Sequence, residues 1–198
     1  MQNITSKKQL FLSHTWQKDV NSRNNHHRTG LLKKELSKIG WTVWYDQDDM
    51  GLNLDASMVN GIEQCEAFIV CVTKNYAEEI NKSSFNLRSR SNCLKEFNYA
   101  NSRNKIFIYV LFDKLHHIPV GILTMYMAST IYVDGSGDNL KATAEKITHL
   151  LESQNIKPVE SQSKESKWKF CLQKLQQKRQ QKIHKAWQSK KIKTIIYI

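Results

Sequence analysis

Short, strongly apolar segments alternate with amphipathic segments along most of this chain, and that alternation limits the possible fold more than any other feature. The apolar segments are residues 10–14, 41–46, 67–72, 106–112 and 130–133. Regular alternation of strands with helices is typical of a parallel sheet that carries helices on both faces. The continuous apolar run at residues 67–72 is typical of a central strand covered on both sides. The sequence therefore predicts an α/β fold with a flavodoxin-like, five-stranded parallel sheet.

Helices are predicted between these strands by apolar residues at helical spacing. The predicted helices are one containing Leu32, Leu36 and Ile39, one containing Met58, Ile62 and Cys65, and those at residues 92–102, 119–127 and 140–151. Residues 73–92 lack a clear pattern and are predicted to be irregular, with one helical turn around residues 76–80. In folds of this class ligands bind beyond the carboxyl ends of the strands. The predicted site therefore lies among the loops at residues 13–16, 46–54 and 73–96.

The helix predicted at residues 92–102 carries the acidic residue of greatest interest. Cys93, Phe97 and Ala100 share one side of this helix, and Glu96 lies at the rim of that apolar stripe. A carboxyl group at such a rim can be drawn into a cleft, where partial burial would raise its pKa and suit it to chemistry. The alternative is a solvated glutamate that pairs with a neighbouring basic residue.

The net charge of +12 belongs almost wholly to the C-terminal part of the chain. Residues 157–198 hold 12 basic and 2 acidic residues, whereas residues 1–156 hold 18 basic and 16 acidic residues. The first part is nearly neutral, so bulk charge gives no reason to expect that it binds nucleic acid. We predict a domain at residues 1–156, a linker at 157–166 and a basic amphipathic helical tail at 167–198.

The predicted tail carries Trp168, Leu175, Ile183 and Trp187 at near-helical spacing among many lysines and glutamines. Three interpretations are open: a helix that packs on the domain or on a second copy, an oligomerisation or membrane-surface helix, and a solvated tail. We favour partial docking of this helix on the domain or on a second copy. The basic side chains would bind an anionic partner such as lipid or RNA only weakly, and the apolar end at residues 195–198 suggests a longer protein.

The cysteines and histidines indicate a reducing location and no metal site. The four cysteines form no CxxC pair, and three lie in apolar or helical settings typical of buried free thiols. This favours a cytoplasmic location. No run is long enough to span a bilayer, and residues 1–8 lack the apolar core of a secretory signal. His26-His27 and His116-His117 are adjacent pairs whose side chains diverge, and no cysteine lies at ligand spacing, so no metal site is predicted.

Five segments, in this order and at suitable spacing, resemble the motifs of the TIR domain (Toll/interleukin-1 receptor domain) family. They are Phe11-Leu12-Ser13-His14, Gly40-Trp41-Thr42-Val43-Trp44-Tyr45-Asp46, the loop at residues 46–54, the helix at residues 58–65 and Asn92-Cys93-Leu94-Lys95-Glu96. The resemblance extends from about residue 8 to about residue 153. An aromatic residue usually stands at the position of His14 in this family. The loop at residues 46–54 occupies the place of the family's BB loop.

The resemblance implies one of two functions. Some family members are scaffolds that signal through TIR–TIR contacts, and others cleave the nicotinamide–ribose bond of NAD+ with the glutamate of the C-x-x-E motif, which is Glu96 here. The Asn-Cys pair before Glu96 and the Asp and Met residues of the BB loop, Asp46 and Met50, resemble microbial and protist members, which favours the enzyme. NAD+ is then the substrate and no cofactor is expected. The rival is a non-catalytic scaffold in signalling.

Further substrate-binding candidates flank the predicted strands: His14, Thr15, Trp16, Asp46, Met50 and Cys93. Trp16 would either stack on a flat heteroaromatic ring or pack over its own loop. Asp46 would hydrogen-bond a ribose hydroxyl or cap the following turn, with the structural role slightly favoured. Trp44, at a strand end, is predicted to belong to the core.

The BB loop at residues 46–54 is the surface through which the resemblance implies self-association, and that contact would gate the pocket. One departure from the family pattern affects this expectation. The second half of the loop is apolar and uncharged here, whereas the family often has a proline or a basic residue there. The geometry of assembly is therefore expected to differ, or the loop packs down on the domain.

Overall fold

The computed structural model describes residues 8–49, 53–82 and 91–159. By its contacts the chain divides into two units, Met1–Pro158 and Val159–Ile198. The second unit, apart from Val159, lies outside the described residues, so the linker at residues 157–166 and the helical tail at 167–198 stay predictions. No helix in the described part of the chain is long and apolar enough to cross a membrane.

The first unit is built on a five-stranded parallel sheet, which confirms the predicted fold class. The strands are β1 (Leu10–Ser13), β2 (Val43–Trp44), β3 (Ala67–Val72), β4 (Ile106–Leu111) and β5 (Tyr132–Asp134). Their order in the sheet is β2-β1-β3-β4-β5. β2 therefore lies on one side of β1, and β3 lies on the other. The point at which the strand order reverses leaves a crevice at the carboxyl ends of the strands.

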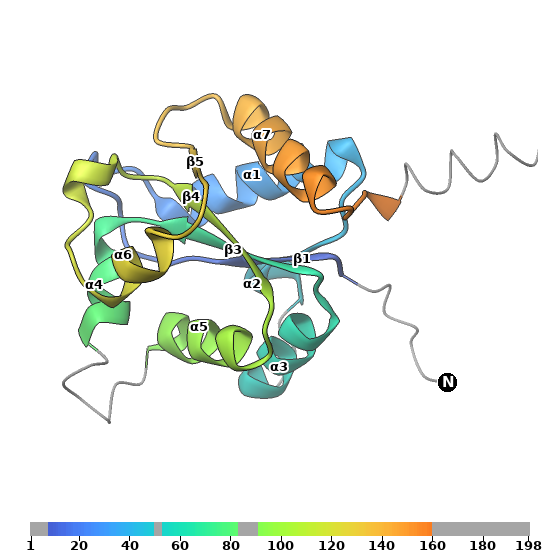
Figure 1. Cartoon of the computed structure of the whole chain (residues 1–198), viewed down its shortest axis with the longest axis horizontal. Helices are drawn as coiled ribbons and strands as arrows, with labels where there is room; N and C mark the ends of the chain where they lie inside the picture. The colour runs from blue at the N-terminus through green and yellow to red at the C-terminus, as the bar shows by residue number, and fades with distance from the viewer. Residues whose placement is uncertain (1–7, 50–52, 83–90, 160–198) are drawn as a thin grey trace, which may run out of the picture. The chain divides into compact units, whose positions relative to one another are not determined.

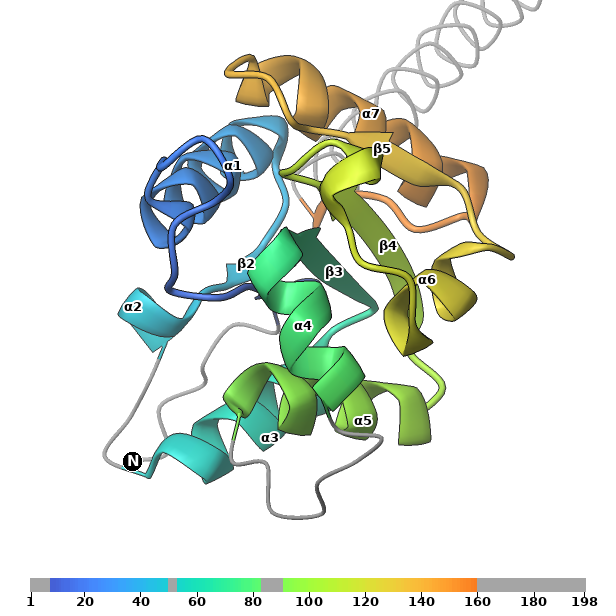
Figure 2. The ribbon, with the colours of Figure 1, turned by 90° about the vertical axis from the view of Figure 1, so that its left-hand side faces the viewer.

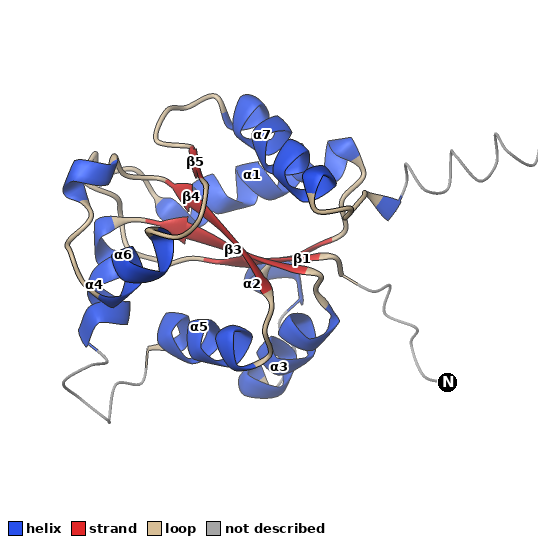
Figure 3. Cartoon of the chain, viewed as in Figure 1, coloured by secondary structure: helices blue, strands red, loops and turns tan. Residues whose placement is uncertain are grey.

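Helices cover both faces of the sheet (Figure 1, Figure 3). They are α1 (Asn25–Ile39), α2 (Asp46–Asp49), α3 (Leu54–Gln64), α4 (Lys74–Lys82), α5 (Asn92–Ser102), α6 (Ile122–Met127) and α7 (Leu140–Ser153), with a short 3-10 turn at Leu115–His117. In Figure 2, α1 and α7 lie on one side of the strands and α3 and α5 on the other. Each strand residue faces one layer or the other, because successive side chains of a strand alternate.

The two faces bury separate apolar cores. Leu10 and Leu12 of β1 join the core beneath α1 and α7, with Leu36 and Ile147 of those helices. Phe11 joins the opposite core beneath α3, α4 and α5. Both faces of the sheet are therefore dry, which explains why β3 is continuously apolar.

The prediction for residues 73–92 was wrong in its first half, because residues 74–82 form the complete helix α4. The apolar stripe of α4 is narrow: Tyr76, Ala77 and Ile80 are its buried residues. The Thr73 hydroxyl accepts a hydrogen bond from the backbone N–H of Tyr76 at 3.2 Å and so caps the first turn. The cap and the packing on the sheet stabilise this helix, which the sequence pattern indicates only weakly because it has few apolar residues.

The structure also defines two boundaries between loops and helices. The helix predicted to contain Leu32, Leu36 and Ile39 begins earlier than those residues, because α1 starts at Asn25 and the side chain of Asn24 caps the N–H of His27 at 2.8 Å. The first residues of the predicted BB loop form the short helix α2, in which the Asp49 carboxylate accepts from the N–H of Tyr45 at 3.0 Å. Residues 50–52 of that loop lie outside the described residues.

Candidate functional site

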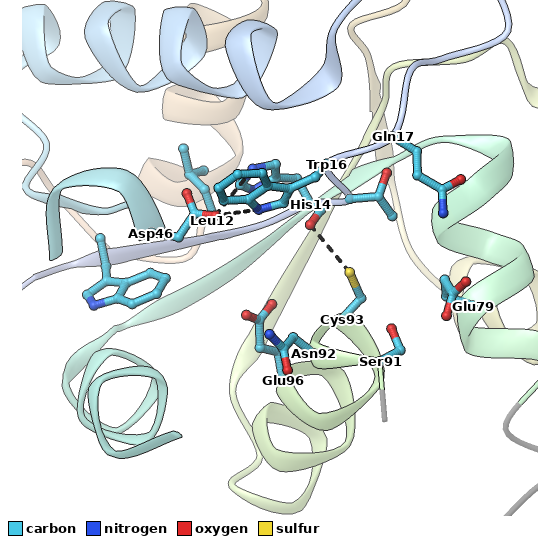
Figure 4. A pocket seen from close by; sticks show the side chains of 12 residues that line it. Leu12, His14, Trp16, Gln17, Asp46, Glu79, Ser91, Asn92, Cys93 and Glu96 are labelled. Carbon is cyan, nitrogen blue, oxygen red and sulfur yellow. Dashed lines mark hydrogen bonds and ion pairs between the residues drawn. The ribbon is translucent and has the colours of Figure 1, made fainter. Parts of the chain in front are cut away.

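The carboxyl ends of β1 and β2 and the first turns of α5 enclose a cavity of about 310 Å³ (Figure 4). Its walls are formed by Leu12, His14, Thr15, Trp16, Gln17, Trp44, Asp46, Glu79, Ser91, Asn92, Cys93 and Glu96. The cavity therefore lies where the sequence predicted a site, beyond the strand ends and beside the switch point of the sheet. It is at the small end of the range of about 300–1,000 Å³ that is typical of small-molecule pockets.

Glu96 projects from α5 into the cavity wall, where the residue is only 8% exposed. The Ser13 hydroxyl, at the end of β1, donates a 2.7 Å hydrogen bond to Oε2 of Glu96. The Ser13 oxygen is also 2.9 Å from the Tyr76 hydroxyl, so Tyr76 serves as its donor. Side chains from β1, α4 and α5 thus form a buried chain of hydrogen bonds that holds the carboxyl group in place.

Burial raises the pKa of Glu96 from 4.5 to about 8, because a buried carboxylate loses its hydration. The hydrogen bond from Ser13 opposes this rise, and the nearby negative charge of Asp46 adds to it. The free protein therefore holds Glu96 mostly as a neutral acid at neutral pH. A cation brought into the cavity would favour the carboxylate, since it supplies the charge that burial removes. The position that the sequence predicted for Glu96, at the rim of the stripe and drawn into a cleft, is the one observed.

His14, Thr15 and Cys93 line the cavity together, as the sequence placed them. The Cys93 thiol donates to the backbone carbonyl of His14 at 3.3 Å. The Thr15 carbonyl accepts from the side-chain amide of Asn25 at 2.9 Å. The segment after β1 is thereby held from both sides. Burial raises the pKa of Cys93, so its thiol stays neutral and serves as a hydrogen-bond donor.

Trp16 and Asp46 lie together at the mouth of the cavity. The indole N–H of Trp16 donates to Oδ2 of Asp46 at 2.8 Å, and the ring stacks on His26 with a centroid distance of 4.3 Å. The Trp16 side chain nevertheless stays 66% exposed. The ring therefore packs on α1 and also presents surface to the cavity. Asp46 Oδ1 accepts from the N–H of Gln47 at 2.9 Å, so one oxygen of this carboxylate bonds the first turn of α2.

Trp44 belongs to the core, as predicted, and also closes the floor of the cavity. Its ring stacks on Phe11 with a centroid distance of 4.1 Å and an interplanar angle of 8°. Gly61 of α3 lies against the same indole: a Cβ atom at this position would approach the ring to 2.7 Å. The glycine thus permits the close packing of α3 against the residue that forms the cavity floor.

The structure adds residues that the sequence did not single out. Glu79 of α4 lines the cavity wall, and Ser13 faces Glu96 because β1 ends beside α5. His26, considered in the sequence only beside His27, contacts His14 and Asp46 from the first turn of α1. His26 is a polar residue just after the start of a helix that Asn24 caps, and this position was the one available sequence signal for it. Met50, the remaining substrate-binding candidate, lies outside the described residues.

The three described cysteines, Cys65, Cys71 and Cys93, are free and buried, as the sequence predicted. Burial raises the pKa of each thiol. They are therefore neutral, inert side chains of the core and of the cavity wall.

Comparison with known families agrees with the arrangement of strands and helices. The model of the TIR domain matches residues 10–151, which is most of the chain. The protein therefore belongs to the TIR domain family. A search of curated proteins found no match.

Proposed function

We propose that this TIR domain cleaves the bond between nicotinamide and ribose in NAD+, with Glu96 as the catalytic carboxylate. The observation that carries the proposal is the position of Glu96: its carboxyl group is buried in the wall of a cavity, hydrogen-bonded by Ser13, with a pKa raised to about 8. Strongly shifted acids in clefts are typical of catalytic sites.

The chemistry requires one such carboxylate. Nicotinamide leaves NAD+ as a neutral group, so little acid assistance is needed, and the main demand is stabilisation of the positive charge that develops on the ribose. Glu96 supplies negative charge at that point from a site with little water, where electrostatic stabilisation is strong. The cationic nicotinamide ring itself favours ionisation of Glu96 on binding. The products are nicotinamide and ADP-ribose or a cyclic form, and NAD+ is the substrate with no further cofactor.

The other candidates then have binding roles. The cavity is of a size for the nicotinamide riboside end of NAD+, with the adenosine end extending past Trp16. Trp16 offers an exposed ring for stacking. Asp46, His14, Thr15 and Cys93 line the ribose side, and Met50 would approach from the BB loop. We place the reaction in the cytoplasm, which fits the free buried cysteines.

Self-association is proposed to activate the enzyme through the BB loop at residues 46–54. α2 begins with Asp46, which also lines the cavity, so a contact on this loop would act directly on the site. A second surface favours the scaffold as the alternative function. Met58, Val59, Ile62 and Tyr99 line an apolar hollow between α3 and α5, and Val59 is exposed. Such a surface suits a contact with another TIR domain.

The test is release of nicotinamide from NAD+ by the full chain at high protein concentration. Native protein is compared with Glu96→Gln and with the control Glu152→Gln, which changes an exposed glutamate of α7. We expect turnover by the native chain and the control and none by Glu96→Gln. Turnover that survives Glu96→Gln, or no turnover by concentrated native protein, would reject the enzyme and leave the scaffold.

A further inference from the structure

Three side chains with the donor atoms of a transition-metal site converge beside the cavity. His14 follows β1, His26 lies in the first turn of α1 and Asp46 begins α2. His14 Nε2 is 2.8 Å from His26 Nδ1 and 3.7 Å from Asp46 Oδ2, and His26 Nδ1 is 3.6 Å from Asp46 Oδ1. In a tetrahedral zinc site with bonds of about 2.0–2.1 Å, neighbouring ligand atoms are about 3.3 Å apart. The two separations from Asp46 involve its two different oxygens. With one ligand atom taken from each residue, the three atoms all lie within 4.8 Å of one another, so modest side-chain movements would bring them to this spacing.

The outer nitrogen of His26 is already used. The Tyr45 hydroxyl donates to the backbone carbonyl of His26 at 2.9 Å, so at 3.0 Å from Nε2 of the same residue its oxygen is an acceptor. His26 therefore carries its hydrogen on Nε2. Nε2 of His14 faces Nδ1 of His26 at 2.8 Å, and one hydrogen between these nitrogens makes the contact a hydrogen bond when no metal is bound.

Nδ1 of His26, with the hydrogen of that ring on Nε2, presents a lone pair toward His14 at 2.8 Å, and a metal ion would replace the hydrogen that joins the two imidazoles. A carboxylate is adjacent, so the pocket formed by these atoms has one negative charge and two neutral nitrogen donors. Outer hydrogen bonds that orient the ring of each ligand are the usual companions of metal-bound histidines.

Hydrogen bonds from neighbouring residues likewise orient the carboxylate of Asp46. Trp16 donates to its Oδ2 and the backbone of Gln47 to its Oδ1, which leaves lone pairs on both oxygens free to bind an ion. The Trp16 ring stacks on His26 and covers the cluster from the solvent side. His14 and Asp46 also line the cavity. The open side of the cluster is therefore the side that faces the cavity.

We propose that His14, His26 and Asp46 bind a divalent transition-metal ion, with zinc as the best fit. Two imidazoles and one carboxylate form the ligand set of many zinc sites that keep a fourth position open. Magnesium and calcium are excluded by their preference for all-oxygen ligands. The fourth ligand is water or a group bound in the cavity. The sequence-based expectation of no metal site considered neighbouring histidines, whereas these ligands come from three separate segments.

The test uses cobalt(II) as a spectroscopic substitute for zinc. Full-length protein is freed of metal with a chelator and titrated with cobalt(II) in the absence of NAD+. We expect saturation at one equivalent, visible d–d bands of a four- or five-coordinate ion, and no thiolate-to-cobalt charge-transfer band. The missing charge-transfer band separates this site from binding by cysteine. Addition of zinc should displace the cobalt and abolish the spectrum.

Three variants assign the site. His26→Phe keeps a ring in the stack between Trp16 and Tyr45 but has no ligand nitrogen, and should abolish the spectrum. His27→Ala, an exposed histidine one residue away, should leave it unchanged. Tyr45→Phe removes only the hydroxyl that orients His26 and should weaken cobalt binding about 10- to 100-fold. Circular dichroism confirms the folding of each variant.

The outcomes are exclusive. A proton shared between the two imidazoles, without metal, would give a protein that takes up no cobalt at one equivalent, and this result overturns the proposal. A spectrum that persists in His26→Phe, or one that His27→Ala also loses, overturns it as well. Because the titration contains no NAD+, its result is independent of whether the protein cleaves that nucleotide.

Discussion

The hydroxyl of Ser13 donates to the carboxyl group of Glu96 at 2.7 Å, across 83 residues of sequence and between β1 and α5. This hydrogen bond opposes the effect of burial on the ionisation of Glu96. Burial favours the neutral acid, and the Ser13 hydrogen bond favours the carboxylate. The pKa of about 8 results from these opposed effects. It determines how the folding stability and the rate of NAD+ cleavage are expected to change with pH.

Glu96→Gln should stabilise the fold at neutral pH. The folded-state pKa of Glu96 lies above its ordinary value of 4.5, so the native state binds the proton more tightly than the unfolded state. The stability of the native protein therefore falls as pH rises from 4.5 to about 8, whereas that of Glu96→Gln does not fall for this reason. We expect a gain of about 1–3 kcal/mol for the variant at neutral pH.

Urea unfolding of both proteins at a series of pH values measures this effect. The gain should shrink toward zero near pH 4.5, where Glu96 is protonated in both states, and should be largest above pH 8. Glu152→Gln is the control, since that side chain is exposed on α7 and should change the stability little. A gain that is independent of pH would contradict the raised pKa.

Ser13→Ala should move the pH dependence of NAD+ cleavage upward. If Glu96 acts as a carboxylate, kcat/KM should rise about tenfold per pH unit below its pKa and level off above about 8. Removal of the Ser13 hydroxyl takes away the hydrogen bond that favours the carboxylate. The midpoint of the profile should therefore shift to higher pH, with activity recovered in alkaline solution.

The measurement is kcat/KM against pH for native protein and Ser13→Ala. Ser13→Thr keeps a hydroxyl and serves as the matched control, and its midpoint should stay near the native one. Midpoints that coincide in native protein and Ser13→Ala would show that Glu96 does not set the profile.

Gly61→Ala should destabilise the fold although alanine is the better helix former. The exchange gains about 1 kcal/mol of helix propensity. The added Cβ would lie 2.7 Å from the indole of Trp44, which is itself stacked on Phe11, so the ring has little room to move. Overpacking of this kind costs about 1–3 kcal/mol, and we expect a net loss.

Thermal unfolding checks this expectation against Asn60→Ala, an exposed change in the same helix that should be neutral or stabilising. Because Trp44 lines the cavity, a shift of its ring should also raise KM for NAD+. An increase in the melting temperature of Gly61→Ala would show that α3 can move away from the sheet.

Arg28→Met should destabilise the domain by about 3–5 kcal/mol, because it removes the central cation of a buried network. Arg28 donates to the Asp19 carboxylate at 2.9 Å and to the carbonyls of Phe112, Gly135 and Gly137. These bonds tie α1 to the loops after β4 and β5. Urea unfolding measures the loss, and Lys34→Met, an exposed change in the same helix, is the control. Equal stability of the two variants would contradict the role of Arg28.

The sequence predicted Glu96 more completely than the other parts of the site. Its place beside Phe97 on a helix made partial burial with a raised pKa one of two interpretations, the other being a solvated glutamate, and the structure shows the buried one. The partners of Glu96 were not predictable in this way. Ser13 and Tyr76 belong to segments that meet only when β1 and α4 pack beside α5.

The helix α4 shows a second limit of prediction from the sequence. No sequence pattern predicted α4 beyond one turn, because three buried residues in nine are a weak signal and the helix depends on a threonine cap and on its contact with the sheet. Its contribution to the cavity wall, through Glu79, was likewise visible only in the structure.

The sequence by itself determined the alternation of strands and helices, the parallel sheet and the edge at which a site must lie, because these follow from hydrophobic periodicity and from the chirality of the connections. Only the tertiary structure decided which side chains meet there. The convergence of His14, His26 and Asp46 arises from three segments that no local pattern relates. Local periodicity determines which face of an element is buried, whereas the packing of elements determines what each buried polar group touches.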